Sequence, residues 1–265
     1  MCKVIGIISL KGGVGKTSVT AALGDAIAGF DKRVLLVDGN LSAPNLGLHF
    51  NIVNPEVSLH QVLDRTAKPT DAIHSLENFD LLPASLFSRL NNSSPLKLKD
   101  RISSLKNKYD VIIIDSSPAL DEETLGVMLA SDEILVVTTP DHPTLANTVR
   151  AINLAKQRGT PISGLILNKV YDKDFELSLG DIEEVSNVPI LAVIPHDVNI
   201  LKALSEYTTS TSYRPNSKGS EEFKKLGAAL IGERYEVSPF KRFFTWANPE
   251  KQDINRTIFY DEVFK

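Results

Sequence analysis

The sequence has almost no cysteine and no long hydrophobic run. Its one cysteine, Cys2, cannot form a CxxC pair, an iron–sulfur cradle or a disulfide framework, so we expect an intracellular protein in a reducing compartment. The apolar runs, such as VIII at 111–114, are too short to cross a bilayer, which excludes an integral membrane protein. The N-terminal residues have the pattern of a strand, and we expect no cleavable signal there.

An excess of positive charge and the common metal and nucleophile motifs are also missing. Lys and Arg total 29 against 33 Asp and Glu, so the net charge of -4 provides no chain-wide cationic field for nucleic acid. The five histidines have no HExxH or CxxC neighbours, and no GxSxG sequence occurs. We therefore expect neither a zinc site nor a serine hydrolase.

Apolar, β-branched runs alternate with segments of helical period, which is typical of βαβ units on a parallel sheet. The pattern predicts an α/β fold, a doubly wound and mostly parallel sheet of about seven strands with helices on both faces. The predicted strands are 4–9, 33–38, 79–84, 110–116, 133–139, 162–168 and 190–195, and the predicted helices are 16–29, 95–107, 122–130, 143–158, 178–186, 198–206 and 217–231.

A glycine-rich loop, KGGVGKTS at 11–18, follows the first predicted strand and precedes a predicted helix. Its glycines allow backbone N–H groups to converge on phosphate oxygens at the helix N-terminus. Lys16 would reach the β and γ phosphates, and the hydroxyl of Thr17 would bind Mg²⁺. The predicted phosphate-binding residues are Lys11, Gly12, Gly13, Val14, Gly15, Lys16, Thr17 and Ser18.

Two aspartates end predicted strands at the edge of the sheet where α/β proteins bind ligands. Asp38 ends the strand 33–38, and Asp115 lies at the end of the strand 110–116. Together with Thr17 they are the predicted metal ligands. The alternative for Asp38 is a carboxylate that only ends a strand or caps a turn.

The loop departs from the strict pattern GxxxxGK[ST], because Leu10 occupies the position of the first glycine and Lys11 follows it. In this respect it resembles the deviant Walker A motif of the MinD/ParA family of P-loop ATPases, and the resemblance covers residues 1 to about 231. The resemblance implies ATP and Mg²⁺ as cofactors. It also implies that Lys11 contacts the partner's phosphates in an ATP-bound homodimer; the alternative is a solvated surface lysine.

The resemblance assigns catalytic roles to Lys11, Lys16, Asp38 and position 40, where the family generally has an aspartate that orients the attacking water. This chain has Asn40 there. An amide can hydrogen-bond a water but cannot take its proton, so we expect slow hydrolysis.

Further along the chain, the resemblance implies an adenine pocket formed by Asn168, Pro195 and Asp197. In the sequence ILNK, Asn168 lies at the end of one predicted strand. The sequence VIPHD at 193–197 lies at the end of the next predicted strand. The alternative is that Asn168 only caps a turn.

Three further sequences, GxLxxxNL at 39–46, the stretch around 62–73 and YRPNSKG from 213, are similar to MinD-like proteins. They imply an ATP-dependent dimerising switch ATPase for spatial positioning, with an activating protein partner. One alternative is a ParA-type DNA partition ATPase, against which the net charge argues. Another is a nearly non-hydrolysing scaffold gated by ATP.

We divide the chain into a P-loop ATPase domain, 1–234, and a C-terminal tail, 235–265, which we expect to be irregular and aromatic. In VSPFKRFFTWANP at 237–249, Phe240, Phe243 and Phe244 share one helical face, while Lys241 and Arg242 lie on the other. We expect a cytoplasmic protein that binds reversibly to the inner face of the cell membrane through this segment. The alternative is that these aromatic residues and a second apolar cluster pack onto the domain or a partner. The second cluster is Ile258, Phe259, Tyr260, Val263 and Phe264.

Overall fold

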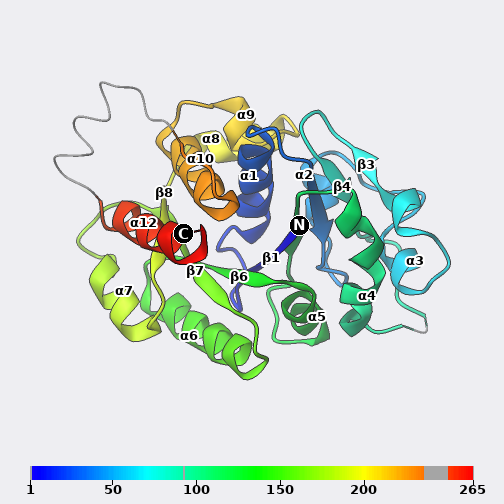
Figure 1. The fold of residues 1–265 in the computed structure, drawn as a ribbon, viewed down its shortest axis with the longest axis horizontal. Helices are drawn as coiled ribbons and strands as arrows, with labels where there is room; N and C mark the ends of the chain where they lie inside the picture. Colours follow the sequence, from blue (N-terminus) through cyan, green and yellow to red (C-terminus); the bar gives the residue numbers. More distant parts are fainter. Residues whose placement is uncertain (1, 92, 236–249, 265) are drawn as a thin grey trace.

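A computed structural model describes residues 2–91, 93–235 and 250–264. They contain an eight-stranded sheet of order β3-β4-β2-β5-β1-β6-β7-β8, which confirms the predicted doubly wound α/β fold (Figure 1). Neighbouring strands are parallel except β3 and β4, which are antiparallel. The strands are β1 (Lys3–Ile8), β2 (Val34–Asp38), β3 (His74–Ser75), β4 (Asp80–Leu82), β5 (Val111–Asp115), β6 (Glu133–Thr138), β7 (Ile162–Val170) and β8 (Ile190–Pro195). The prediction of about seven strands missed β3, because two residues form no apolar run.

Most helices lie where the sequence periodicity predicted them. The predicted helix 95–107 is instead a series of three short helices, and in this region the hydroxyl of Ser103 donates to the carbonyl of Asp100 (2.7 Å), in competition with helical bonding. The α-helices are α1 (Lys16–Ala28), α2 (Leu46–His49), α3 (Leu59–Leu63), α4 (Leu98–Ile102), α5 (Glu122–Ala130), α6 (His142–Gln157), α7 (Leu179–Ser186), α8 (Val198–Ser205), α9 (Ser210–Tyr213), α10 (Lys218–Ile231) and α12 (Lys251–Phe264), and the 3₁₀ helices are η1 (Pro69–Ala72), η2 (Pro95–Lys97) and η3 (Ser103–Asn107).

Two apolar clusters cover the two faces of the sheet. One contains the inner faces of α1 and α10, and the other contains those of α3 to α7. Figure 1 shows these helices on opposite sides of the strands. Because the central strands are parallel, their carboxyl ends lie at one edge, where the loops that follow them are brought together.

The C-terminal residues depart from the prediction. The expectation of an irregular course for 235–265 is wrong over Lys251–Phe264, which form helix α12 against β8 and α10. Phe259 is 8% exposed within the apolar cluster of α1 and α10, so the alternative of aromatic packing on the domain holds for this residue. Phe240, Phe243 and Phe244 lie outside the described residues, and the division at residue 234 stays a prediction.

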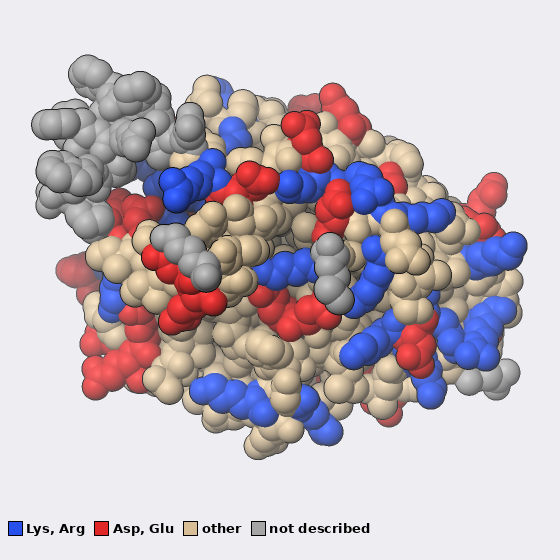
Figure 2. Space-filling model, in the orientation of Figure 1, with Lys and Arg blue, Asp and Glu red and all other residues tan. Residues whose placement is uncertain are grey.

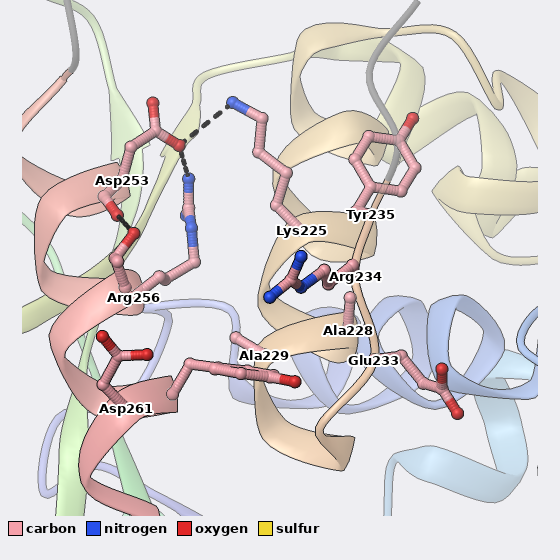
Figure 3. Close-up of a pocket in the computed structure, with 11 residues that line it drawn as sticks. Lys225, Ala228, Ala229, Glu233, Arg234, Tyr235, Asp253, Arg256 and Asp261 are labelled. Carbon is pink, nitrogen blue, oxygen red and sulfur yellow. Dashed lines mark hydrogen bonds and ion pairs between the residues drawn. The ribbon is translucent and has the colours of Figure 1, made fainter. Parts of the chain in front are cut away.

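Ion pairs join α12 to α10 at the cavity shown in Figure 3. The guanidinium of Arg256 donates to Glu222 (2.9 Å), to Asp253 and to the carbonyl of Leu191 in β8 (2.7 Å). Lys225 pairs with Glu222 (3.0 Å) and Asp253 (3.4 Å). The side chain of Arg256 is only 6% exposed, so loss of its partners would leave a buried charge uncompensated.

The described part of the chain contains no helix long and apolar enough to cross a membrane.

We expect Arg256→Ala to lower the free energy of unfolding by about 3 kcal/mol or more, because Glu222 and Asp253 would lose a buried cation. Urea denaturation measures this change. Lys251→Ala is the control, since Lys251 pairs with Glu183 from a side chain that is 45% exposed and should cost about 1 kcal/mol or less. Equal effects of the two substitutions would contradict an integral role for the buried Arg256.

Candidate functional site

The loop between β1 and α1 has the backbone of a phosphate cradle. Gly13 (φ 81°) and Gly15 (φ 95°) adopt the left-handed conformation that favours glycine. The N–H groups of Gly12, Gly13 and Val14 form no hydrogen bond within the described residues. Three unpaired donors beside a helix N-terminus fit the oxygens of a phosphate.

The end of β7 fixes the opposite side of this loop. The side-chain amide of Asn168 donates to the carbonyl of Val14 (2.7 Å), and the ammonium of Lys169 donates to the carbonyl of Gly13 (2.7 Å). A side chain at Gly15 would overlap the amide nitrogen of Asn168, so this contact also requires glycine. The two residues hold the carbonyls and leave the N–H groups of the loop for a ligand.

The first residues of α1 carry the charged and hydroxyl groups of the site. Lys16 is buried, and burial lowers its pKa while the charge of Asp115 opposes the shift. The hydroxyl of Thr17 donates to Asp115 (2.6 Å), and that of Thr20 donates more weakly (3.4 Å). Burial raises the pKa of Asp115 to about 6, against the lowering effects of Lys16 and Thr17.

Asp38 lies beside Asp115, because the two residues pair in register at the ends of β2 and β5. Its carboxylate is completely buried and accepts backbone N–H bonds from Asn40 (3.2 Å), Asn45 (3.2 Å) and Leu46 (3.0 Å). Burial and then the charge of Asp115 raise the pKa of Asp38 to about 8. The predicted role as metal ligand and the alternative of a turn cap are thus both compatible with its position.

Thr17, Asp38 and Asp115 supply the oxygen donors that Mg²⁺ prefers. The charge of Asp115 disfavours the ionised form of the adjacent Asp38, and a divalent cation would relieve that repulsion. When bound, Mg²⁺ neutralises charge on phosphate oxygens. The residues present therefore fit the cation, and their assignment as its ligands stays a prediction.

The loop after β2 holds Asn40 away from solvent. Its amide nitrogen donates to the carbonyl of Ala43 (2.5 Å), and its amide oxygen accepts the N–H of Ala43 (3.3 Å). Asn40 is only 5% exposed. The two bonds to Ala43 leave one amide hydrogen and one lone pair of Asn40 for a water.

The side chain of Lys11 contacts different residues from that of Lys16. Its ammonium donates to Thr144 (2.6 Å) and pairs with Asp141 (3.2 Å) at the N-terminus of α6. Burial acts to raise the pKa of Asp141, but hydrogen bonds from Thr139, Thr144 and Lys11 hold it at about 2. The side chains of Lys11 and Asp141 are 38% and 42% exposed, so the ion pair lies at the rim of the site.

The residues of the predicted adenine pocket lie on two neighbouring strands. Asn168 ends close to the loop, and its side-chain oxygen is buried without a hydrogen-bond partner in the described structure. Pro195 is in register with Val170 on β7. Asp197 caps α8 by accepting the N–H of Asn199 (2.8 Å), so its carboxylate is already used. The unpaired oxygen of Asn168 supports a ligand contact at this residue, and the adenine role of all three stays a prediction.

Several residues of the site were missed in the sequence. In the sequence, Asp141 and Thr144 indicate only the start of a helix. They do form the start of α6, since Asp141 accepts the N–H of Thr144 (2.9 Å). Lys169 adjoins Asn168 in ILNK, but no local pattern indicated its contact with the loop. No sequence pattern indicated a role for Glu123, because the residues that it contacts lie in another segment of the chain.

On the described part of the face in Figure 2, Lys and Arg side chains lie among Asp and Glu side chains. Within the described residues no group of three or more His, Cys, Asp or Glu could hold a metal ion by itself, so the expected Mg²⁺ depends on Thr17 and phosphate oxygens as well.

The loop, Lys16 and the strand-end carboxylates define a P-loop nucleotide-binding protein. Residues 2–159 match the AAA domain family, and residues 98–231 match the ParA family, described as NUBPL iron-transfer P-loop NTPase. An ATP-binding protein of Methanocaldococcus jannaschii is 34% identical over 86% of this chain and 88% of its own. The septum site-determining protein MinD of Thermotoga maritima is 32% identical, over 88% of this chain and 89% of its own.

Among solved structures, MinD of Pyrococcus horikoshii OT3 complexed with Mg-ADP is similar, with a TM-score of 0.79 and 36% identity over 87% of this chain and 96% of that one. The chain therefore belongs to the MinD/ParA family of P-loop NTPases. The resemblance inferred from KGGVGKTS is confirmed.

The two raised pKa values predict a pH-dependent stability. The folded nucleotide-free protein retains protons on Asp38 and Asp115 up to about pH 8 and about pH 6, whereas an unfolded aspartate releases its proton near about pH 4. The folded state thus binds more protons in this window, so their contribution to the free energy of unfolding decreases from about pH 4 to about pH 8. Asp115→Asn should show a shallower decrease.

Urea denaturation at a series of pH values, with wild type and Asp115→Asn compared, measures this contribution. The buried His49 and His60, whose pKa values burial lowers, titrate in both proteins and cancel in the difference. We also expect Mg²⁺ to increase the free energy of unfolding of the ADP-bound wild type, and not that of ADP-bound Asp115→Asn. Identical pH slopes would contradict the raised pKa of Asp115. An Mg²⁺ effect retained in the variant would contradict the assignment of Asp115 as a metal ligand.

Proposed function

We propose that this protein is an Mg²⁺-dependent ATPase that dimerises with ATP and acts as a positional switch, with ATP and Mg²⁺ as cofactors. The observation that carries the proposal is the position of Lys11. Lys16 is buried near Asp115 of its own chain, whereas Lys11 lies at the rim in an exposed ion pair with Asp141. Such a pair contributes about 1 kcal/mol or less, so Lys11 can exchange it for a phosphate of a second chain.

The relatives support this proposal. The P. horikoshii and T. maritima proteins are named as septum site-determining, and a solved complex from Aquifex aeolicus, of the same fold, joins MinC to MinD. A protein that changes between monomer and dimer with ATP can bind an activating partner or a surface in one state and release it in the other. We extend this role, with a protein activator, to the present chain.

We expect Lys11→Ala to bind ADP nearly as wild type but to stay monomeric with a slowly hydrolysed ATP analogue, because the ammonium makes its proposed contact only across the dimer. Gel filtration with light scattering measures the mass. Lys16→Ala is the control that should lose ATP binding itself. A Lys11→Ala dimer as stable as that of the wild type would contradict the contact.

Slow hydrolysis is proposed because Asn40 lacks a proton-accepting group and is bonded to Ala43. Asn40→Asp should increase turnover at saturating Mg·ATP on the order of 10², the contribution of a positioned base. Phosphate release measures it.

Asn45→Asp is the matched control, since the Asn45 amide also donates to the carbonyl of Ala43 (2.7 Å). Equal acceleration by both variants would indicate loosening of the loop instead of a carboxylate at position 40. If the wild type shows no turnover and neither variant accelerates it, the ATP-gated scaffold is supported.

We further propose that the protein is cytoplasmic and contacts the inner face of the membrane reversibly through Phe240, Phe243 and Phe244, which lie outside the described residues. Vesicles with anionic lipids should pellet the wild type with the ATP analogue, because two copies of a weak anchor add avidity. Phe243→Asp should lose this pelleting. Phe87→Asp is the control, since Phe87 is 72% exposed elsewhere on the surface and should keep it. Pelleting that is independent of nucleotide or of Phe243 would contradict the anchor.

A further inference from the structure

The turn that follows β2 is fixed from inside by its own residues. The amide of Asn40 bonds both backbone groups of Ala43, and the N–H of Asn40 donates to Asp38 (3.2 Å). These contacts fix the shape of the turn 40–43. They do not connect the turn to the loops that follow the other strands of the sheet.

Glu123 holds the same turn from outside. One carboxylate oxygen accepts the N–H of Leu41 (3.0 Å), and the other accepts the hydroxyl of Ser42. Glu123 is 8% exposed and forms no ion pair with another described residue. It belongs to the first turn of α5, where the positive end of the helix dipole stabilises a carboxylate. The buried carboxylate of Glu123 thus accepts hydrogen bonds from two neutral donors of a single turn.

The first turn of α5 also holds the segment 116–121 that follows β5 and Asp115. The carboxylate of Asp121 accepts the N–H of Thr124 (3.0 Å) and the hydroxyl of Ser117 (3.0 Å). The hydroxyl of Thr124 donates to the carbonyl of Ala119 (2.7 Å). Both loops that flank the paired aspartates are therefore bonded to one helical turn.

We propose that Glu123 is a positioning residue that couples the turn 40–43 to the segment 116–121, so that the two loops respond to nucleotide together. This inference rests on the proposed function, since it assigns the regulation of the same site. Glu123 acts through Leu41 and Ser42 and touches no reacting atom. Its glutamate length is required, because the carboxylate must reach from α5 across to the β2 loop and accept two donors at once.

Hydrogen exchange of the two loops tests the coupling without any turnover. In the wild type, the slowly hydrolysed ATP analogue should change exchange in both 40–43 and 116–121. In Glu123→Ala, the turn 40–43 should exchange about tenfold faster or more, the scale of one hydrogen bond to a charged group, and should lose its response to nucleotide while 116–121 keeps it. Glu122→Ala, which removes an exposed acid that accepts from Ser94 and makes no contact with the turn 40–43 among the described residues, is the matched control and should behave as wild type.

Kinetics separate positioning from general structure. We expect Glu123→Ala to reduce kcat about tenfold or more with ADP affinity changed less than about threefold. Glu123→Gln retains an oxygen for Leu41 and an amide that can donate to Ser42, and it should restore at least about one third of kcat. Ser42→Ala, which leaves α5 untouched, should lower kcat in the same direction, and its effect should be non-additive with Glu123→Ala.

Two results would overturn the coupling: a nucleotide response at 40–43 that persists in Glu123→Ala, or a Glu123→Gln variant as impaired as Glu123→Ala. The first would show that the turn moves independently of α5, and the second that the charge matters instead of the position. If the wild type fails to hydrolyse ATP, the proposed function fails, but the exchange measurements still decide the coupling.

Discussion

The burial of two aspartates side by side is the constraint on which the rest of the site depends. Asp38 and Asp115 end adjacent parallel strands in register and are almost completely excluded from water. An isolated buried carboxylate is strongly disfavoured, so the surrounding chain must supply donors or a proton. It supplies the hydroxyl of Thr17 and the backbone of the loop after β2, and the raised pKa values show that this compensation is incomplete.

A cation bound together with phosphate would complete this compensation. The loop between β1 and α1 presents unpaired N–H donors, while Asn168 and Lys169 hold its carbonyls in place. Lys16 is also buried with a lowered pKa. Anionic phosphate would stabilise the lysine and the N–H groups, and Mg²⁺ would stabilise the carboxylates. A neutral ligand would satisfy neither set.

The C-terminal helix changes how the tail must be understood. Because α12 is bonded to α10 and β8 through Arg256, the residues that precede it are connected to the domain at both ends of the segment 236–249. A membrane contact in that segment would therefore be followed in the chain by a helix that is packed on the domain. The buried ion pairs and Phe259 make this arrangement part of the folded domain.

Glycine, lysine and threonine types at a fixed spacing after an apolar strand determined the phosphate loop, and strand periodicity determined the sheet and the edge where Asp38 and Asp115 meet. Such features follow from local backbone preference and alternation along the chain. Only the tertiary structure decided that Lys11 pairs with Asp141, 130 residues away, that Glu123 holds Leu41, 82 residues away, and that Lys251–Phe264 fold onto β8. No local pattern indicates which residues these contacts join, because polar partners are selected by the packing of the sheet and its helices.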